Sequence, residues 1–210
     1  MIERKEKELG NKYTLNAPNK CSDALDRFPK VLINGTKFTQ VGHESAGDNN
    51  AIKVDIFIIE NVPDNSIVRY FKGMRCQALM YIASCVNEYN RKEQSVFLQT
   101  EEGRKLFKRR ARVAKLFSFK NLHQWFDAVD TACMYKEAKT KNVSLPSGTK
   151  HYFGEMLPAD VMTPVSKVKF GDADVYLPNK PEKYLENRYG EDYMDILADG
   201  EWERVFTEKP

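Results

Sequence analysis

Hydrophobic positions recur along this chain with two different periods, and each period predicts a different kind of element. Over residues 67–89, apolar residues recur every three or four positions, which predicts a long amphipathic helix. The same spacing predicts helices over residues 101–120, 121–133 and 181–189. Residues 52–59 form instead a continuous run of β-branched and aromatic residues, which predicts a strand buried on both faces. The residues expected to face the core from the first helix are Ile67, Phe71, Met74, Ala78, Ile82, Cys85 and Tyr89.

Turn-forming residues divide the segments between these elements. Asn34-Gly35 lies between two apolar stretches, and this dipeptide predicts a β-hairpin. Gly171-Asp172 predicts a second hairpin over residues 165–177. The polar residues 41–50 and 139–150 contain Gly, Asn, Ser or Pro, and they predict loops.

Composition and charge narrow the classes of protein. With 210 residues, 41% of them hydrophobic, the chain is long enough for one sizeable core, so we expect a single domain over residues 1–210. Its 33 basic and 30 acidic residues give a net charge of +3, a balance too even to indicate nucleic-acid binding. The first residues lack the apolar region of a signal peptide and no later run is long enough to span a membrane, so a cytoplasmic protein is expected. The cysteines have neither metal-ligand spacing nor the density of a disulfide-stabilised domain, so reduced, buried thiols are expected at Cys21, Cys76, Cys85 and Cys133.

A single carboxylate, Asp55, interrupts the apolar run of residues 52–59. An ionised carboxylate without a partner in a protein core costs several kcal/mol. We therefore expect Asp55 to be hydrogen-bonded, paired with a cation, or placed at a cleft as a metal ligand or acid–base group. A buried Asp that accepts hydrogen bonds from backbone donors or pairs with an Arg is the alternative to a functional site.

Positive charge is concentrated locally in residues 101–120, where Leu106, Val113 and Leu116 supply only a thin apolar seam. A solvated helix face is one interpretation of this segment. The other is a surface that attracts an anionic polymer or membrane headgroups. The candidates for contact with such an acceptor or anionic surface are Arg104, Lys108, Arg109 and Arg112.

Three stretches resemble the LicD family. Residues 54–64, Val-Asp-Ile-Phe-Ile-Ile-Glu-Asn-Val-Pro-Asp, resemble its "IDIFPLD" segment. Residues 177–194 are similar to its closing "iP…yL…YGdym" signature, which is the more specific match. Residues 28–36 resemble its early strand, in which a lysine, here Lys30, precedes the hydrophobic run. These stretches follow the family's order over almost the entire chain.

The resemblance implies an α/β (α+β) fold in which a nucleotidyltransferase-like mixed β-sheet is flanked by helices. Members of the family, which include the fukutin-related proteins, transfer phosphorylcholine or a phospho-alditol from a CDP-activated donor to a glycan with the help of a divalent metal. The expected cofactor is therefore Mg2+, and the expected acceptor is a glycan or glycolipid of teichoic acid, lipopolysaccharide or capsule. Asp55 matches the third metal-binding carboxylate of the family, and Lys30 is a candidate phosphate or nucleotide contact.

The chain departs from the family at its start, because the Gly-rich and Asp-rich block that carries the other two carboxylates has no counterpart before residue 28. We therefore expect an N-terminally truncated LicD-like domain. The alternatives are a catalytically incomplete module, whose partner chain would supply the missing carboxylates, and a polyanion-binding protein acting through residues 104–115. Asp64, Asp172 and Asp174 are substitutes by composition only. Peripheral contact with the inner face of a membrane is a further expectation.

Overall fold

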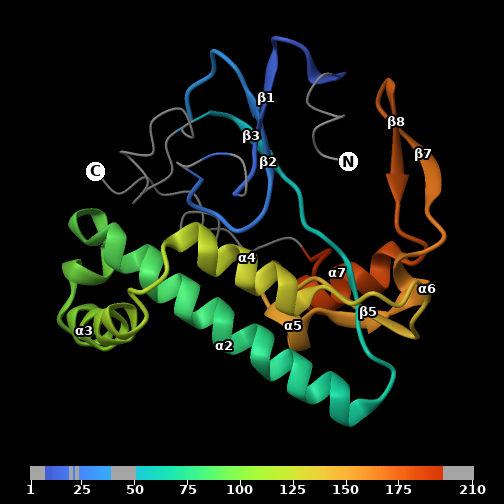
Figure 1. Ribbon diagram of the computed structural model, residues 1–210. Coiled ribbons are helices and arrows are strands. Elements are labelled where there is room, and N and C mark those ends of the chain that lie inside the picture. The colour runs from blue at the N-terminus through green and yellow to red at the C-terminus, as the bar shows by residue number, and fades with distance from the viewer. Residues whose placement is uncertain (1–7, 19–20, 22–23, 39–50, 196–210) are drawn as a thin grey trace. The chain divides into compact units, whose positions relative to one another are not determined.

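The computed structural model describes residues 8–18, 21, 24–38 and 51–195 (Figure 1). The chain divides into two compact units, Met1–Met156 and Leu157–Pro210. Helices and small antiparallel sheets make up both, which confirms the α/β (α+β) class at that level. That the whole chain forms one domain stays a prediction.

Helix α2 (Ser66–Asn90) is the long helix expected from the apolar spacing (Figure 1). It begins where predicted, because the Asn65 side chain accepts hydrogen bonds from the backbone N–H groups of Ile67 and Val68. The predicted core face is wrong over the first turns, since Phe71 is 68% exposed. Small residues face the core there, because the neighbouring elements approach α2 closely. A Cβ atom at Gly73 would lie 2.3 Å from the Phe153 ring. The buried residues of α2 are Gly73, Cys76, Ala83, Cys85 and Val86.

Helices α3 (Glu101–Leu116) and α4 (Leu122–Cys133) pack against α2. Asn121 and Gln124 form a capping box that begins α4. The ring nitrogen of Trp125 donates to the Phe117 carbonyl (3.1 Å), which ties α4 to the end of α3. The helix predicted over residues 121–133 is confirmed, and its buried residues are Leu122, Trp125, Phe126, Val129, Ala132 and Cys133.

The predicted apolar seam of α3 is wrong for Leu106 and Leu116, whereas its third residue, Val113, packs against the core. Leu106 and Leu116 are exposed, at 41% and 72%. The side of α3 that faces the core carries Ala114, which is buried, together with the half-buried Phe107 and Phe117. The short 3-10 helices η2 (Lys92–Gln94) and η3 (Val96–Gln99) connect α2 to α3.

Strands β1 (Tyr13–Asn16), β2 (Lys30–Ile33) and β3 (Lys53–Asp55) form an antiparallel sheet in that order. The predicted Asn34-Gly35 turn follows β2, with Gly35 at φ +76°, a conformation that favours glycine. The hairpin itself is not formed, since residues 36–38 are not a strand and both edges of β2 pair with β1 and β3. The loop expected over residues 41–50 lies outside the described residues.

The run 52–59 is not the fully buried strand predicted. β3 ends at Asp55 and β4 comprises only Glu60–Asn61. Val54 is 63% exposed, and Ile52, Ile56, Ile58 and Ile59 are exposed as well. The reason is that β3 is the edge strand of its sheet and hydrogen-bonds only to β2 in the part of the chain that the structure describes.

Strand β4 pairs antiparallel with β5 (Asn142–Ser144), which lies in the segment expected to be a loop. Helix α5 (His151–Gly154) and strand β6 (Met156–Pro158) follow. In the smaller unit, α6 (Ala159–Met162) precedes β7 (Ser166–Phe170) and β8 (Ala173–Leu177), which form the predicted second hairpin. Helix α7 (Pro181–Tyr189) ends at Gly190, as predicted. No helix within the described ranges has the length and apolar character needed to cross a membrane.

Candidate functional site

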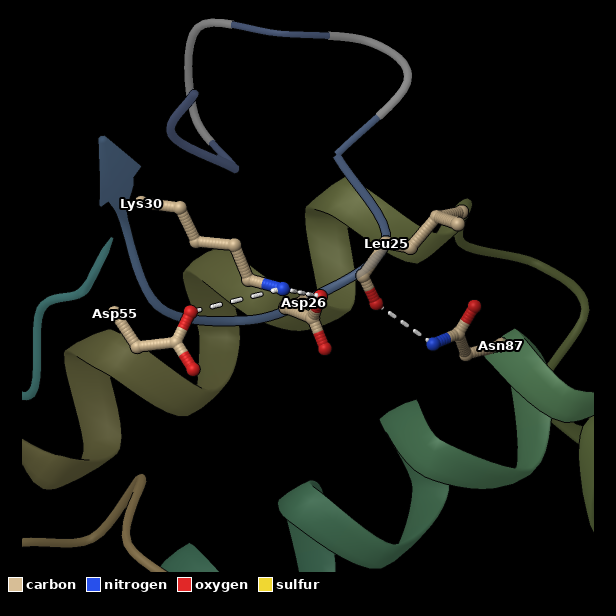
Figure 2. A network of polar contacts seen from close by, with 5 residues as sticks. All are labelled: Leu25, Asp26, Lys30, Asp55 and Asn87. Atoms are coloured by element: carbon tan, nitrogen blue, oxygen red, sulfur yellow. Dashed lines mark hydrogen bonds and ion pairs between the residues drawn. The ribbon is translucent and has the colours of Figure 1, made fainter. Parts of the chain in front are cut away.

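Lys30 and Asp55 lie opposite each other on neighbouring strands. The register of β2 and β3 pairs Lys30 with Asp55, so their side chains project from the same face of the sheet. The Lys30 Nζ atom is 4.0 Å from the Asp55 Oδ1 atom (Figure 2). Lys30 is only 7% exposed, whereas the Asp55 side chain is 37% exposed. Asp55 is therefore paired with a cation, and it lies at the rim of the sheet and not in a core.

A second carboxylate, Asp26, contacts the same ammonium group. Lys30 Nζ donates a hydrogen bond to Asp26 Oδ2 (Figure 2). The adjacent Leu25 carbonyl accepts a hydrogen bond from the Asn87 side chain of α2 (2.8 Å), so α2 holds the segment that carries Asp26. Sequence reasoning missed Asp26: its spacing of four residues from Lys30 indicates a pair on a helix, and this segment is not helical.

Lys53 completes this group of charges, which we call the Lys30 cluster: Asp26, Lys30, Lys53 and Asp55. Burial lowers the pKa of Lys53, the Lys30 ammonium lowers it further, and the two carboxylates oppose the shift. Two ammonium groups thus balance two carboxylates. The arrangement offers cationic contacts for phosphate oxygens beside anionic ligands for a metal ion.

A pocket of about 110 Å³ lies elsewhere in the larger unit. Arg27 reaches it from the segment before β2, with its Nη1 atom 3.7 Å from Asp130 Oδ1. Its Nη2 atom donates to the Pro146 carbonyl (2.9 Å), which fixes the guanidinium group. The residues that line the pocket are Arg27, Ile58, Glu60, Asp130, Cys133, Met134, Pro146 and Ser147.

Both carboxyl groups of this pocket titrate above their ordinary range. Burial raises the pKa of Asp130 to about 6, although the Arg27 guanidinium opposes the shift. Burial also raises the pKa of Glu60, Asp130 adds to the shift, and Lys72 opposes it. A carboxyl group with a pKa near 6 exchanges its proton close to neutral pH, as general acid–base chemistry requires. Nothing in the sequence pairs Glu60 with Asp130, because they come from β4 and α4.

Cysteines of the larger unit are reduced, as predicted. The predicted burial is confirmed for Cys76, Cys85 and Cys133 and is wrong for Cys21, which is partly exposed. A hydrogen bond with Cys76 raises the pKa of Cys133, and burial raises it further, so this thiol stays protonated.

The basic candidates lie on α3. Arg104, Lys108, Arg109 and Arg112 are all exposed there. A shallow hollow of about 570 Å³ is lined by Glu102, Lys105, Leu106, Lys108, Arg109 and Arg112. Arg104 does not line it, and its guanidinium group donates to the Leu98 carbonyl instead.

Two of the three carboxylates considered as substitutes, Asp64 and Asp174, have partners of their own. Asp64 Oδ1 accepts from the backbone N–H of Lys141 (2.8 Å). Asp174 lies 2.7 Å from the Nζ atoms of both Lys167 and Lys169, and these ammonium groups lower the pKa of its carboxyl. Neither contact involves the Lys30 cluster.

The described residues contain no group of three or more His, Cys, Asp or Glu side chains that could hold a metal ion. Asp26 and Asp55 are nevertheless two carboxylates around one cation. Because Mg2+ is usually held by one or two carboxylates together with substrate phosphates, Asp26 and Asp55 are the residues of the Lys30 cluster that could contribute ligands to such an ion.

Comparison of the chain with protein-family models, with curated proteins and with solved structures gave no match.

Proposed function

We propose that this protein is a LicD-type phosphotransferase with a nucleotidyltransferase-like fold, which transfers phosphorylcholine or a related phospho-group from a CDP-activated donor to a cell-surface glycan. One observation carries the proposal. Lys30 and Asp55, which the resemblance singles out, are 25 residues apart in the sequence and occupy paired positions on β2 and β3 with charged atoms 4.0 Å apart. Asp26 adds a carboxylate that the resemblance does not supply.

The chemistry of the proposed reaction suits these groups. Phosphoryl transfer needs little covalent help from the protein and depends on positive charge placed around the phosphate oxygens. Lys30 supplies a point charge for this purpose, and Lys53 lies close enough to respond to it electrostatically. Asp26 and Asp55 would hold Mg2+, which when bound neutralises charge on the phosphates.

Binding of the donor is the direct test. Isothermal titration calorimetry with CDP-choline should show binding by the wild-type chain in Mg2+ and none after the metal is removed with EDTA. Asp55→Asn should weaken binding at least about tenfold, which corresponds to ~1.4 kcal/mol. Asp127→Asn is the matched control, because this exposed residue of α4 has the same change in charge and lies outside the Lys30 cluster.

Absence of Mg2+-dependent binding by a folded wild-type chain would contradict the proposal. The catalytically incomplete module would then be the better description, and adding a partner chain with the missing carboxylates should restore binding. Equal affinities of the wild type and Asp55→Asn would remove Asp55 from the site.

A further inference from the structure

The positive charge of this protein is concentrated on one helix. Helix α3 contains seven Lys or Arg residues and two Glu residues, a net charge of +5, whereas the whole chain has a net charge of +3. The remainder of the chain is therefore slightly acidic. A field of this kind directs one surface of a protein toward an anionic partner.

Helical geometry places most of these charges on one side. Ala114 is buried and the Phe107 and Phe117 side chains are half-buried on the side of α3 that packs toward α2. At 3.6 residues per turn, the opposite side carries residues that are all exposed. We call it the α3 basic face: Lys105, Lys108, Arg109, Arg112 and Leu116, with the single acidic residue Glu101 at its start.

Arg110 shows the contrast with that face. It points toward the core side, where it donates to the Ser84 hydroxyl (2.5 Å) and lies over the Tyr81 and Phe97 rings. The Arg110 guanidinium group therefore interacts with residues of the protein itself.

The charged side chains of the basic face form few ion pairs with other described residues. Lys105 pairs with Glu101 at 3.1 Å, but both side chains are more than 70% exposed, so the pair is held weakly. Among the described residues, Lys108, Arg109 and Arg112 form no ion pair. Three positive charges around the hollow on α3 are thus available to an external anion.

Exposed apolar side chains beside the charges indicate whether the anionic partner is a soluble polymer or a membrane. Leu116, on the basic face, is 72% exposed, and Phe119, which follows the helix, is 70% exposed. A soluble polyanion has no acyl region in which the Leu116 side chain could be buried. An anionic bilayer binds basic side chains through its headgroups and takes up adjacent apolar side chains at the acyl boundary. We infer that the α3 basic face, with Phe119, docks on a membrane surface that contains anionic phospholipid.

Vesicle co-sedimentation with the full chain tests this inference. The wild type should bind phosphatidylcholine vesicles that contain phosphatidylserine, should not bind vesicles of phosphatidylcholine alone, and should be released by salt. Arg109→Glu with Arg112→Glu should lower the affinity at least about tenfold. Lys136→Glu with Lys139→Glu, two exposed residues beyond α4, makes the same change in net charge and should leave binding unchanged.

The apolar contribution needs its own variant. Leu116→Ser with Phe119→Ser keeps every charge and should still weaken vesicle binding several-fold. Because Phe119 also contacts the Trp125 ring, the folding of this variant is checked by circular dichroism. Unchanged vesicle binding by this variant, or binding to heparin without binding to the vesicles, would overturn the inference in favour of a soluble polyanion. CDP-choline binding is measured separately on the same variants and should not change, so this inference and the proposed function can fail independently.

Discussion

Replacing Asp130 by Asn should remove a pH dependence of stability that the wild-type protein shows between about pH 4 and 6. The pKa of this carboxyl rises from 3.8 to about 6 on folding, mainly through burial. Between these values the folded protein keeps a proton that the unfolded chain has released. The free energy of unfolding therefore falls as pH rises through this window, and the contribution is fully present only below the unfolded pKa.

The magnitude follows from the shift and from the exposure of the group. Two pKa units correspond to ~3 kcal/mol for a fully desolvated group. The Asp130 side chain is 47% exposed, and water screens it, so we expect about 1 kcal/mol. Glu60 faces the same pocket, and its raised pKa acts in the same direction.

Urea denaturation at several pH values between 4 and 7 measures the effect, with fluorescence of the buried Trp125 reporting the transition. The difference in unfolding free energy between the wild type and Asp130→Asn should fall by about 1 kcal/mol from the lowest to the highest pH. Asp172→Asn, an exposed carboxylate, serves as the control. A difference that stays constant or grows with pH would refute the desolvation of Asp130.

Other expectations concern packing, charge and thiols. Gly73→Ala should lower stability by about 1–3 kcal/mol, because its Cβ would lie 2.3 Å from the Phe153 ring; a neutral result in the same denaturation assay would contradict the close approach. Lys30→Met should cost about 1 kcal/mol by leaving the carboxylate of Asp26 without its ammonium partner, and unchanged stability would argue against the Lys30 cluster. Ellman's reagent should modify the partly exposed Cys21 rapidly and the three buried thiols only on unfolding, so Cys21→Ser should abolish the fast phase.

Local signals in the sequence located most of the helices. Asn65 and Asn121 begin α2 and α4 through hydrogen bonds to backbone groups two or three residues away, and Gly190 ends α7. These interactions depend on neighbouring residues alone, so a reader of the sequence can find them. The turn at Gly171 and the hairpin around it are local for the same reason.

The burial of each side chain depended on what packs against its element, and several burial predictions made from the sequence were wrong. The run 52–59 has the composition of a buried strand, yet β3 lies at the edge of its sheet and the run is largely exposed. On α2 the apolar residue Phe71 is exposed and Gly73 is buried, because the neighbouring rings leave room only for a small side chain. Periodicity identifies an apolar face but not which face a neighbour covers.

The sequence by itself determined that Asp55 is an unusual carboxylate, that Lys30 precedes a hydrophobic run and that α3 is basic. Only the tertiary structure decided which charges meet. Strand register brought Lys30 opposite Asp55, and the packing of α4 placed Asp130 in the pocket that Glu60 also lines. The physical reason is that a charge pair or a desolvated carboxyl depends on distances between residues remote in the chain, and those distances are set by how sheets and helices pack.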